Sequence, residues 1–348
     1  MENNRKKAIG NTLLFLTVFA LTAYAVFHGQ DLPAMLDAIR DCDLVWLIPA
    51  IFCVVAFIWA ESVILRLLIR SRGLRLSGSR SFLVSTVGFF FSAVTPAAGG
   101  GQPMQAYFLR REKIPIPVSA VTLMAITVTY KLVLVVIGAA LALFGRGFLR
   151  AHLGGAMVLY WIGLCLTVGW IALLLVLVFH PHLAKHIVLG CLGLLERLRL
   201  VRRKKSRREK LLASMAQYSE TAAYFKANMG LMALVLAITF LQRGVLFTVP
   251  WLVYRAFGLS GTGWFTIAVL QSVVSITADM LPLPGGMGVS EGVFLRIFQS
   301  VFGGLVLPGM VLSRGVEFYC RLLISAVFTA LAFAVLGRHR QEREMESE

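Results

Sequence analysis

Eight ionisable side chains fall inside or beside long apolar stretches of the sequence. They are Glu61, Lys131, Arg243, Asp279, Glu291, Arg314, Glu317 and Arg321. A charged side chain near the centre of a membrane-spanning helix costs at least about 2.5–3.5 kcal/mol, so such groups face one another or water. We therefore expect the eight side chains to line one polar cavity within an otherwise apolar protein.

Two kinds of chemistry are open to these groups. Lys131 and Arg243 favour the binding of an anion, such as the phosphate of a lipid headgroup. Arg314, Glu317 and Arg321 follow one another at spacings of three and four residues, which places them on one face of a continuous α-helix. That spacing fits a substrate site, and it equally fits a buried salt-bridge network that only fixes helix packing.

The composition indicates a membrane protein. Of the 348 residues, 58% are hydrophobic and 15% are charged, and the mean hydropathy is +0.79, whereas a soluble domain has roughly a quarter charged residues. The net charge of +17 would suggest a nucleic-acid binder in a soluble protein. Here the basic segments alternate with long apolar runs, a pattern that sets membrane orientation. We expect an all-α polytopic membrane protein with no nucleic-acid partner.

Six apolar runs are long enough to cross a bilayer, whose hydrocarbon core needs roughly 20 helical residues. The runs lie near residues 8–27, 44–65, 118–144, 156–179, 229–254 and 308–336. The first run follows three basic residues and contains Ala23-Tyr24-Ala25, so a cleaved signal peptide is the alternative for this run. We predict about six crossing helices.

The charges between the runs predict the orientation. Residues 66–80 carry five arginines and residues 197–210 carry nine basic residues, whereas residues 30–43 carry four aspartates. By the positive-inside rule both termini are cytoplasmic, and the chain is a multi-pass protein of the cytoplasmic membrane. Residues 182–226 form a basic cytoplasmic insert, either as amphipathic helices on the anionic inner leaflet or as a solvated loop.

Two further apolar segments, 81–113 and 264–300, are too interrupted for simple crossings. The interrupting residues are Pro96, Gly99, Gly100, Gly101, Gln102 and Pro103 in the first segment, and Pro282, Pro284, Gly285, Gly286 and Gly288 in the second. Broken backbone at membrane depth requires protein or a water-filled cavity to satisfy its polar groups. We predict two re-entrant hairpins that enter from opposite faces. Their glycines either present backbone N–H groups to a phosphate or serve only close packing.

The hairpins also predict an internal repeat. Pro-x-x-Gly-Gly begins at Pro96 and again at Pro282, an offset of 186 residues, and Lys131 and Glu317 each follow 35 residues later. The single membrane domain, residues 1–348, then divides into halves 1–144 and 145–348, each with three crossings and one hairpin. An odd number of crossings inverts the second half, which is the plan of many secondary transporters.

Other motifs are weak. The cysteines lack CxxC spacing, and no P-loop or dinucleotide fingerprint occurs. His180, His182 and His186 have no carboxylate or thiolate at ligand spacing, so we expect neither a metal nor a cofactor.

The segments TPAAGGGQP (residues 95–103) and LPLPGGMGVSEG (residues 281–292) resemble the two signature segments of the lysylphosphatidylglycerol synthase transmembrane family, also called flippase-like membrane domains. The resemblance covers nearly the whole chain. The pattern PxPGGxGxxE, which ends at Glu291, is the more specific of the two.

The resemblance implies translocation of aminoacylated phosphatidylglycerol from the inner to the outer leaflet, which lowers negative surface charge and protects against cationic peptides. In full-length relatives a separate cytosolic domain makes that lipid from phosphatidylglycerol and lysyl-tRNA. Only about a dozen polar residues follow Gly337, so we expect no synthase domain here.

Two alternatives to translocation stay open. One is phosphatidylglycerol lysyltransferase activity, by this chain or as an accessory subunit, and the other is a non-transporting lipid-binding scaffold in glycolipid synthesis. The expected partners are membrane phospholipids, a separate lipid-modifying synthase and a second copy of the chain.

Overall fold

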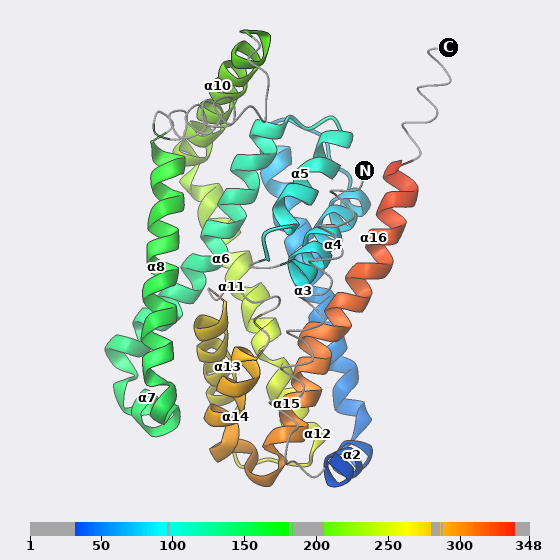
Figure 1. The fold of residues 1–348 in the computed structure, drawn as a ribbon, viewed down its shortest axis with the longest axis vertical. Helices are drawn as coiled ribbons and strands as arrows, with labels where there is room; N and C mark the ends of the chain where they lie inside the picture. Colours follow the sequence, from blue (N-terminus) through cyan, green and yellow to red (C-terminus); the bar gives the residue numbers. More distant parts are fainter. Residues whose placement is uncertain are drawn as a thin grey trace.

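The computed structural model describes residues 32–95, 98–180, 183, 205–279, 286 and 288–337. Within these ranges the chain forms helices joined by turns and no strand, which confirms the all-α prediction (Figure 1). The predicted crossing at 8–27 and the first part of the insert lie outside the described residues. So do four residues of the predicted hairpin motifs, Pro96, Pro282, Pro284 and Gly285.

The helices fall into two groups by length. The long single helices are α3 (Leu47–Ser71), α6 (Ile116–Phe144), α8 (Met157–Phe179), α10 (Lys205–Ala227) and α11 (Met229–Phe247). A further long helical stretch consists of three consecutive parts, α15 (Val306–Arg314), η6 (Gly315–Cys320) and α16 (Arg321–Gly337). The shorter ones are α2 (Leu32–Arg40), η1 (Leu44–Trp46), α4 (Gly78–Val94), α5 (Gly101–Arg111), α7 (Arg146–Leu153), η3 (Gly154–Ala156), α12 (Val249–Ala256), α13 (Trp264–Ala278), α14 (Val289–Phe302) and η5 (Gly303–Leu305).

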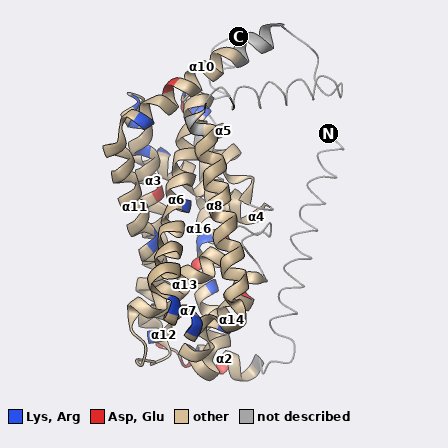
Figure 2. Cartoon of the chain, turned by 90° about the vertical axis from the view of Figure 1, so that its left-hand side faces the viewer, with Lys and Arg blue, Asp and Glu red and all other residues tan. Residues whose placement is uncertain are grey.

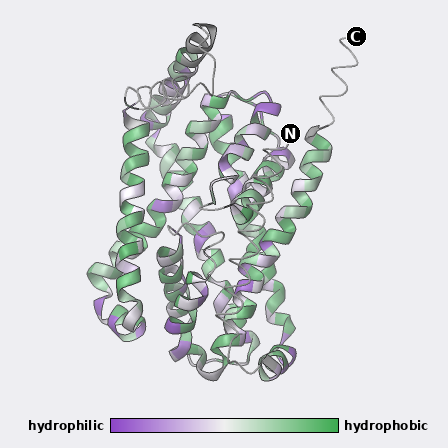
Figure 3. Cartoon of the chain, viewed as in Figure 1, coloured by the Kyte–Doolittle hydropathy of each residue, from purple (hydrophilic) through white to green (hydrophobic). Residues whose placement is uncertain are grey.

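Five helical stretches are long and apolar enough to cross a membrane. They are Leu44–Ser71, Ile116–Phe144, Arg146–Leu177, Met229–Ala256 and Val289–Val335. Each overlaps one predicted crossing, and Figure 3 shows hydrophobic residues along α8 and α16 at the sides of the bundle. The chain is thus a multi-pass membrane protein by the length and composition of its helices.

Local sequence explains several helix ends. Ser77 begins α4, where its Oγ accepts a hydrogen bond from the Arg80 backbone N–H at 3.4 Å. Pro117 lies in the first turn of α6, a position where its missing N–H leaves no helix hydrogen bond unmade. Gly145 ends α6 and separates it from α7.

Two pairs of short helices contain the broken segments of the sequence. α4 contacts α5, and α13 contacts α14. The fifteen residues of α13 extend about 22 Å, less than the roughly 30 Å hydrocarbon core. Figure 1 shows α4 and α5 in the half of the bundle nearest α10, which we call the α10 end, and α13 and α14 in the half nearest α7, the α7 end.

The described part of the insert is docked on the bundle. The Tyr224 hydroxyl donates to the Ser71 carbonyl oxygen at 2.8 Å, and Arg72 forms a 2.6 Å salt bridge with Glu220. Tyr218 and Phe225 are buried against the α10 end of the bundle. The second half of α10 is therefore neither a solvated loop nor a helix that lies apart from the protein.

The apolar interior divides into two clusters along the length of the bundle. Ile58 on α3 belongs to the cluster of the α7 end, whereas Ile64 belongs to the cluster of the α10 end. Leu134 and Ile126 divide α6 between the two clusters in the same way. Glu61 and Lys131 lie at these boundaries, so a polar layer separates the clusters, and Figure 2 shows charged segments within the bundle between its ends.

The arrangement of α4 and α5 predicts a simple topology result. In a cysteine-free background, Ser79→Cys and Arg110→Cys should react with an impermeant thiol reagent from the same side of the membrane, because the 2.6 Å salt bridge between Arg80 and Glu112 joins the start of α4 to the end of α5. Gly147→Cys, exposed on α7, should react from the opposite side. Labelling of Ser79→Cys and Arg110→Cys from opposite sides would show that the segment crosses.

Candidate functional site

An ion pair joins α6 to the end of α13. The Lys131 ammonium forms a salt bridge with Asp279, and the Tyr130 hydroxyl donates to the other carboxylate oxygen of Asp279. Lys131 is buried. Because Asp279 is the residue that follows α13, these contacts hold the end of α13 against α6.

Two arginines in the same layer rest on aromatic rings. The Arg243 guanidinium lies 3.5 Å from the ring centre of Tyr130 and 4.9 Å from that of Phe57. The Arg321 guanidinium lies 5.5 Å from the Phe57 ring centre and 5.8 Å from that of Phe89. Such stacking stabilises a guanidinium while its N–H edge remains available for an anion. The two arginines share one ring and come from α11 and α16.

Arg243 and Arg321 differ from the other cations of the layer in their partners. Neither forms a salt bridge with any residue that the structure describes, and the buried Nε of Arg243 has no hydrogen-bond partner. Each is within electrostatic range of the other. Two guanidinium groups that repel each other favour an anion between them.

Glutamine amides bind two further carboxylates of the layer, Glu61 and Glu317. Gln242 donates to Glu61 at 3.1 Å and to the Phe57 carbonyl oxygen at 3.0 Å. Gln271 donates to Glu317 at 2.8 Å, and the second oxygen of Glu317 is buried without a hydrogen-bond partner. These carboxylates therefore retain acceptor capacity toward a cationic group.

Glu291 has a structural role at the start of α14. Its Oε2 accepts hydrogen bonds from the Gly288 backbone N–H at 2.7 Å and the Ser290 hydroxyl at 2.8 Å. Its Oε1 accepts from the Arg314 Nε at 2.8 Å. A carboxylate in the first turn stabilises a helix N-terminus, so Glu291 joins the start of α14 to the end of α15.

The predicted common face of Arg314, Glu317 and Arg321 needs a correction. The spacing argument assumes a continuous α-helix, whereas residues Gly315–Cys320 form a π-helical turn. A π turn contains an extra residue, so it rotates the following residues relative to an α-helix. Arg314 and Arg321 both remain within electrostatic range of Glu317, but Arg314 contacts Glu291 while Arg321 lies over Phe57 and Phe89.

The glycines of the two broken segments have different structural roles. A Cβ on Gly101 would meet Ser92 Oγ and lie 2.6 Å from the Gly88 carbonyl oxygen, and one on Gly100 would lie 2.6 Å from Thr95 Cγ2. The first segment thus uses its glycines for close packing of α5 on α4. In the second segment Gly286 and Gly288 have φ angles of +69° and +85°, which L-residues with a side chain rarely adopt.

The remaining residues of the first motif lie at the start of α5. Gly99 is exposed, Pro103 lies in the first turn of the helix, and Gln102 donates to the Thr127 hydroxyl of α6 at 2.5 Å. The sequence interpretation missed Phe57, Tyr130, Gln242 and Gln271, all of which contact the charged layer. The two glutamines carried a usable signal, since amides inside apolar helices also require partners.

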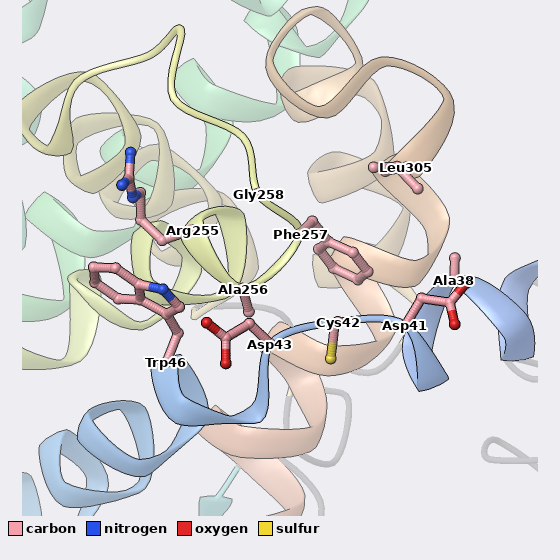
Figure 4. Close-up of a pocket in the computed structure, with 10 residues that line it drawn as sticks. All are labelled: Ala38, Asp41, Cys42, Asp43, Trp46, Arg255, Ala256, Phe257, Gly258 and Leu305. Atoms are coloured by element: carbon pink, nitrogen blue, oxygen red, sulfur yellow. The ribbon is translucent and has the colours of Figure 1, made fainter.

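Two described pockets lie at the α7 end, away from this layer. One has a volume of about 460 Å³ between the α2–η1 connection and α12 (Figure 4). There the Arg255 guanidinium lies 5.2 Å from the Trp46 ring centre, and its Nε is buried without a hydrogen-bond partner. Burial and the neighbouring Asp43 raise the pKa of the Cys42 thiol, so the pocket offers no reactive thiolate.

The comparison with known families identifies the kind of domain. The family described as the lysylphosphatidylglycerol synthase TM region matches residues 11–325. The chain belongs to this family. The match spans every charged residue of the layer, as well as both broken segments. A search of the curated proteins gives no match. Among the described residues, no group of three His, Cys, Asp or Glu side chains is arranged to hold a metal ion.

The Lys131–Asp279 pair predicts a stability effect for this family member. Lys131→Met leaves a carboxylate without its cation at a low-polarity site, which costs about 3–5 kcal/mol. The double variant Lys131→Met/Asp279→Asn should recover part of this loss, because it removes both charges. Unfolding of the purified protein in detergent measures the effect, with the exposed Arg110→Met as control. Equal stability of Lys131→Met and the wild type would contradict the assignment.

The close packing of α4 and α5 predicts a second stability effect. Gly101→Ala should lower the melting temperature, because its Cβ has no room beside Gly88 and Ser92. Gly292→Ala on α14 is the matched control, since nothing lies within 4 Å of its added Cβ. If Gly101→Ala and Gly292→Ala have the same melting temperature, α4 and α5 do not pack as described.

Proposed function

We propose that this chain translocates phospholipids across the membrane, with the headgroup phosphate bound between Arg243 and Arg321. The observation that carries the proposal is the stacking of both guanidinium groups on Phe57, without a salt bridge for either in the described part of the chain. A guanidinium binds a phosphate through two parallel N–H···O contacts. An anion at this position offsets the repulsion between the arginines.

This proposal changes the roles given to individual side chains. Lys131 and Arg314 have carboxylate partners, Asp279 and Glu291, so they position the hairpin ends instead of binding the phosphate. Arg243 keeps the anion-binding role that the sequence suggested. Arg321 replaces Lys131 as the second cation.

Glu61 and Glu317, which form no salt bridge in the described part of the chain, favour a headgroup that also carries an amine. Glu61 and Glu317 each receive a hydrogen bond from a glutamine and lie within electrostatic range of Arg243 and Arg321, respectively. A headgroup with both phosphate and ammonium groups complements such a layer. An aminoacyl phosphatidylglycerol has this chemistry, in agreement with the family name, and its movement to the outer leaflet would lower negative surface charge.

The hairpin arrangement supports movement over static binding. We interpret α4–α5 and α13–α14 as re-entrant hairpins of an inverted repeat that reach the charged layer from opposite ends. α4 packs on α16 and α13 packs on α6, so each hairpin contacts the helix that carries a charge of the layer. Alternate opening of the hairpins would expose the headgroup site to one leaflet at a time, while the acyl chains remain in the bilayer.

The decisive test is leaflet-resolved transport in reconstituted vesicles. Arg243→Gln should slow the movement of aminoacyl phosphatidylglycerol by about 10–100-fold, the loss expected for a charged hydrogen bond of about 1.5–3 kcal/mol. Arg255→Gln is the matched control, because Arg255 also stacks on an aromatic ring but lies at the α7 end.

Three outcomes separate the readings. Slow movement in Arg243→Gln and wild-type movement in Arg255→Gln support translocation. Wild-type protein that binds the lipid without moving it would indicate a scaffold. Formation of lysyl lipid from lysyl-tRNA and phosphatidylglycerol by the purified chain would indicate the synthase alternative.

A further inference from the structure

The ionisable side chains that line a second pocket at the α7 end are all basic. The pocket lies between α7–η3 and α14 and has a volume of about 600 Å³. Its ionisable lining residues are Arg150, His152 and Arg296, and no carboxylate lines it. The pocket beside Arg255 differs, because Asp41 and Asp43 line it as well. Of these two pockets in the described part of the chain, the α7–α14 pocket has the single sign of charge that selects an anion.

The two arginines of the pocket have no anionic partner among the residues that the structure describes. Arg150 and Arg296 are exposed, and neither forms a salt bridge there. Gly155 lies beside one of them, since a Cβ at this position would be in van der Waals contact, at 3.5 Å, with a terminal nitrogen of Arg296. The guanidinium groups come from opposite walls of the pocket and are available to the same ligand.

The surroundings of α7 place the pocket at the depth of lipid headgroups. Phe144, which precedes α7, is 89% exposed, and Trp161 on α8 is 45% exposed. Leu149 and Leu153 of α7 are buried against the protein. A short helix with apolar residues on its protein side and arginines on its outer side, flanked by exposed aromatic residues, is typical of the membrane interface.

The position of Arg150 and Arg296 at the α7 end is unusual for basic residues of a membrane protein. In the predicted orientation the α7 end faces outward, where the positive-inside rule disfavours basic residues. Membrane insertion therefore does not account for Arg150 and Arg296, whereas an anionic ligand in this pocket would. The ligand that is abundant at this depth and carries a negative charge is the phosphate of a phospholipid.

We propose that the α7–α14 pocket binds the phosphate group of an anionic phospholipid from the leaflet at the α7 end. Arg150 on α7 and Arg296 on α14 bind the phosphate from the two walls of the pocket, and His152 lines the pocket beside them. The site is separate from the layer of Arg243 and Arg321, and it does not require that the chain move lipids. A lipid bound here ties α14, the second arm of the α13–α14 pair, to α7.

The test measures retained lipid by native mass spectrometry after release from nanodiscs that contain phosphatidylglycerol and phosphatidylcholine. All variants carry Arg243→Gln, so that the central site contributes equally to each. In that background the protein should retain phosphatidylglycerol selectively, and Arg150→Gln with Arg296→Gln should reduce the retained fraction at least about tenfold. Arg146→Gln is the matched control, because Arg146 also lies on α7 but donates to the Ala142 carbonyl oxygen and does not line the pocket.

Each result bears on the proposal alone. The site is supported if the double variant Arg150→Gln/Arg296→Gln loses selective retention of phosphatidylglycerol while Arg146→Gln keeps it. This result does not depend on whether the chain transports lipid. Equal retention in the double variant and the control overturns it. Displacement of the lipid by low concentrations of inorganic phosphate would assign the pocket to a free anion and overturn the lipid source. A melting temperature of the double variant equal to that of Arg146→Gln excludes misfolding as the cause of a loss.

Discussion

The contacts of Asp279 with Lys131 and Tyr130 organise the polar centre of this protein. Asp279 follows the last turn of α13, where the helix dipole already places partial negative charge. A carboxylate there needs a cation and a hydrogen-bond donor, and adjacent residues of α6 supply both. The same hydrogen bond orients the Tyr130 ring, which supports Arg243. Arg243 in turn shares Phe57 with Arg321, so the contacts of one partly buried carboxylate link five helices, α13, α6, α11, α3 and α16.

The apolar clusters explain why the charged layer lies at a single level. α3 and α6 each contribute residues to both clusters, with one charged residue between the two contributions. Side chains in the clusters are packed on all sides, so the only positions that tolerate charge are those where charged groups from several helices meet. α11 follows the same rule, because Val235 belongs to one cluster, Leu246 belongs to the other, and Arg243 lies between them.

The sequence predicted which residues are charged within apolar surroundings, but not how they pair. Glu61, Lys131 and Arg243 stand out because each interrupts an apolar run long enough to cross a bilayer. Their partners come from other helices, and spacing along one helix says nothing about contacts across a bundle. Lys131 seemed available for a phosphate for this reason, although Asp279, 148 residues away, binds it.

Other features left little trace in the sequence. Phe57 and Tyr130 are ordinary aromatic residues of apolar helices until two arginines are seen to rest on them. The π turn at Gly315–Cys320 changes the periodicity by one residue, which a pattern of three charges is too short to reveal. The Pro-Gly segments were recognisable because glycine and proline interrupt helices directly, and both lie at breaks between short helices.

The π turn also has a mechanical consequence. It separates α15, which packs on α14, from α16, which packs on α4. A π turn and an α turn differ by one residue, so conversion between them rotates the following helix by about 100° and shifts it by about 1.5 Å without unfolding it. The α13–α14 pair and the α4–α5 pair thus pack on opposite sides of the π turn, on one continuous helix formed by α15, the π turn and α16. Conversion of the π turn to an α turn would rotate Arg321 relative to Arg314. It would thereby couple a movement of the α13–α14 pair to a movement of the α4–α5 pair.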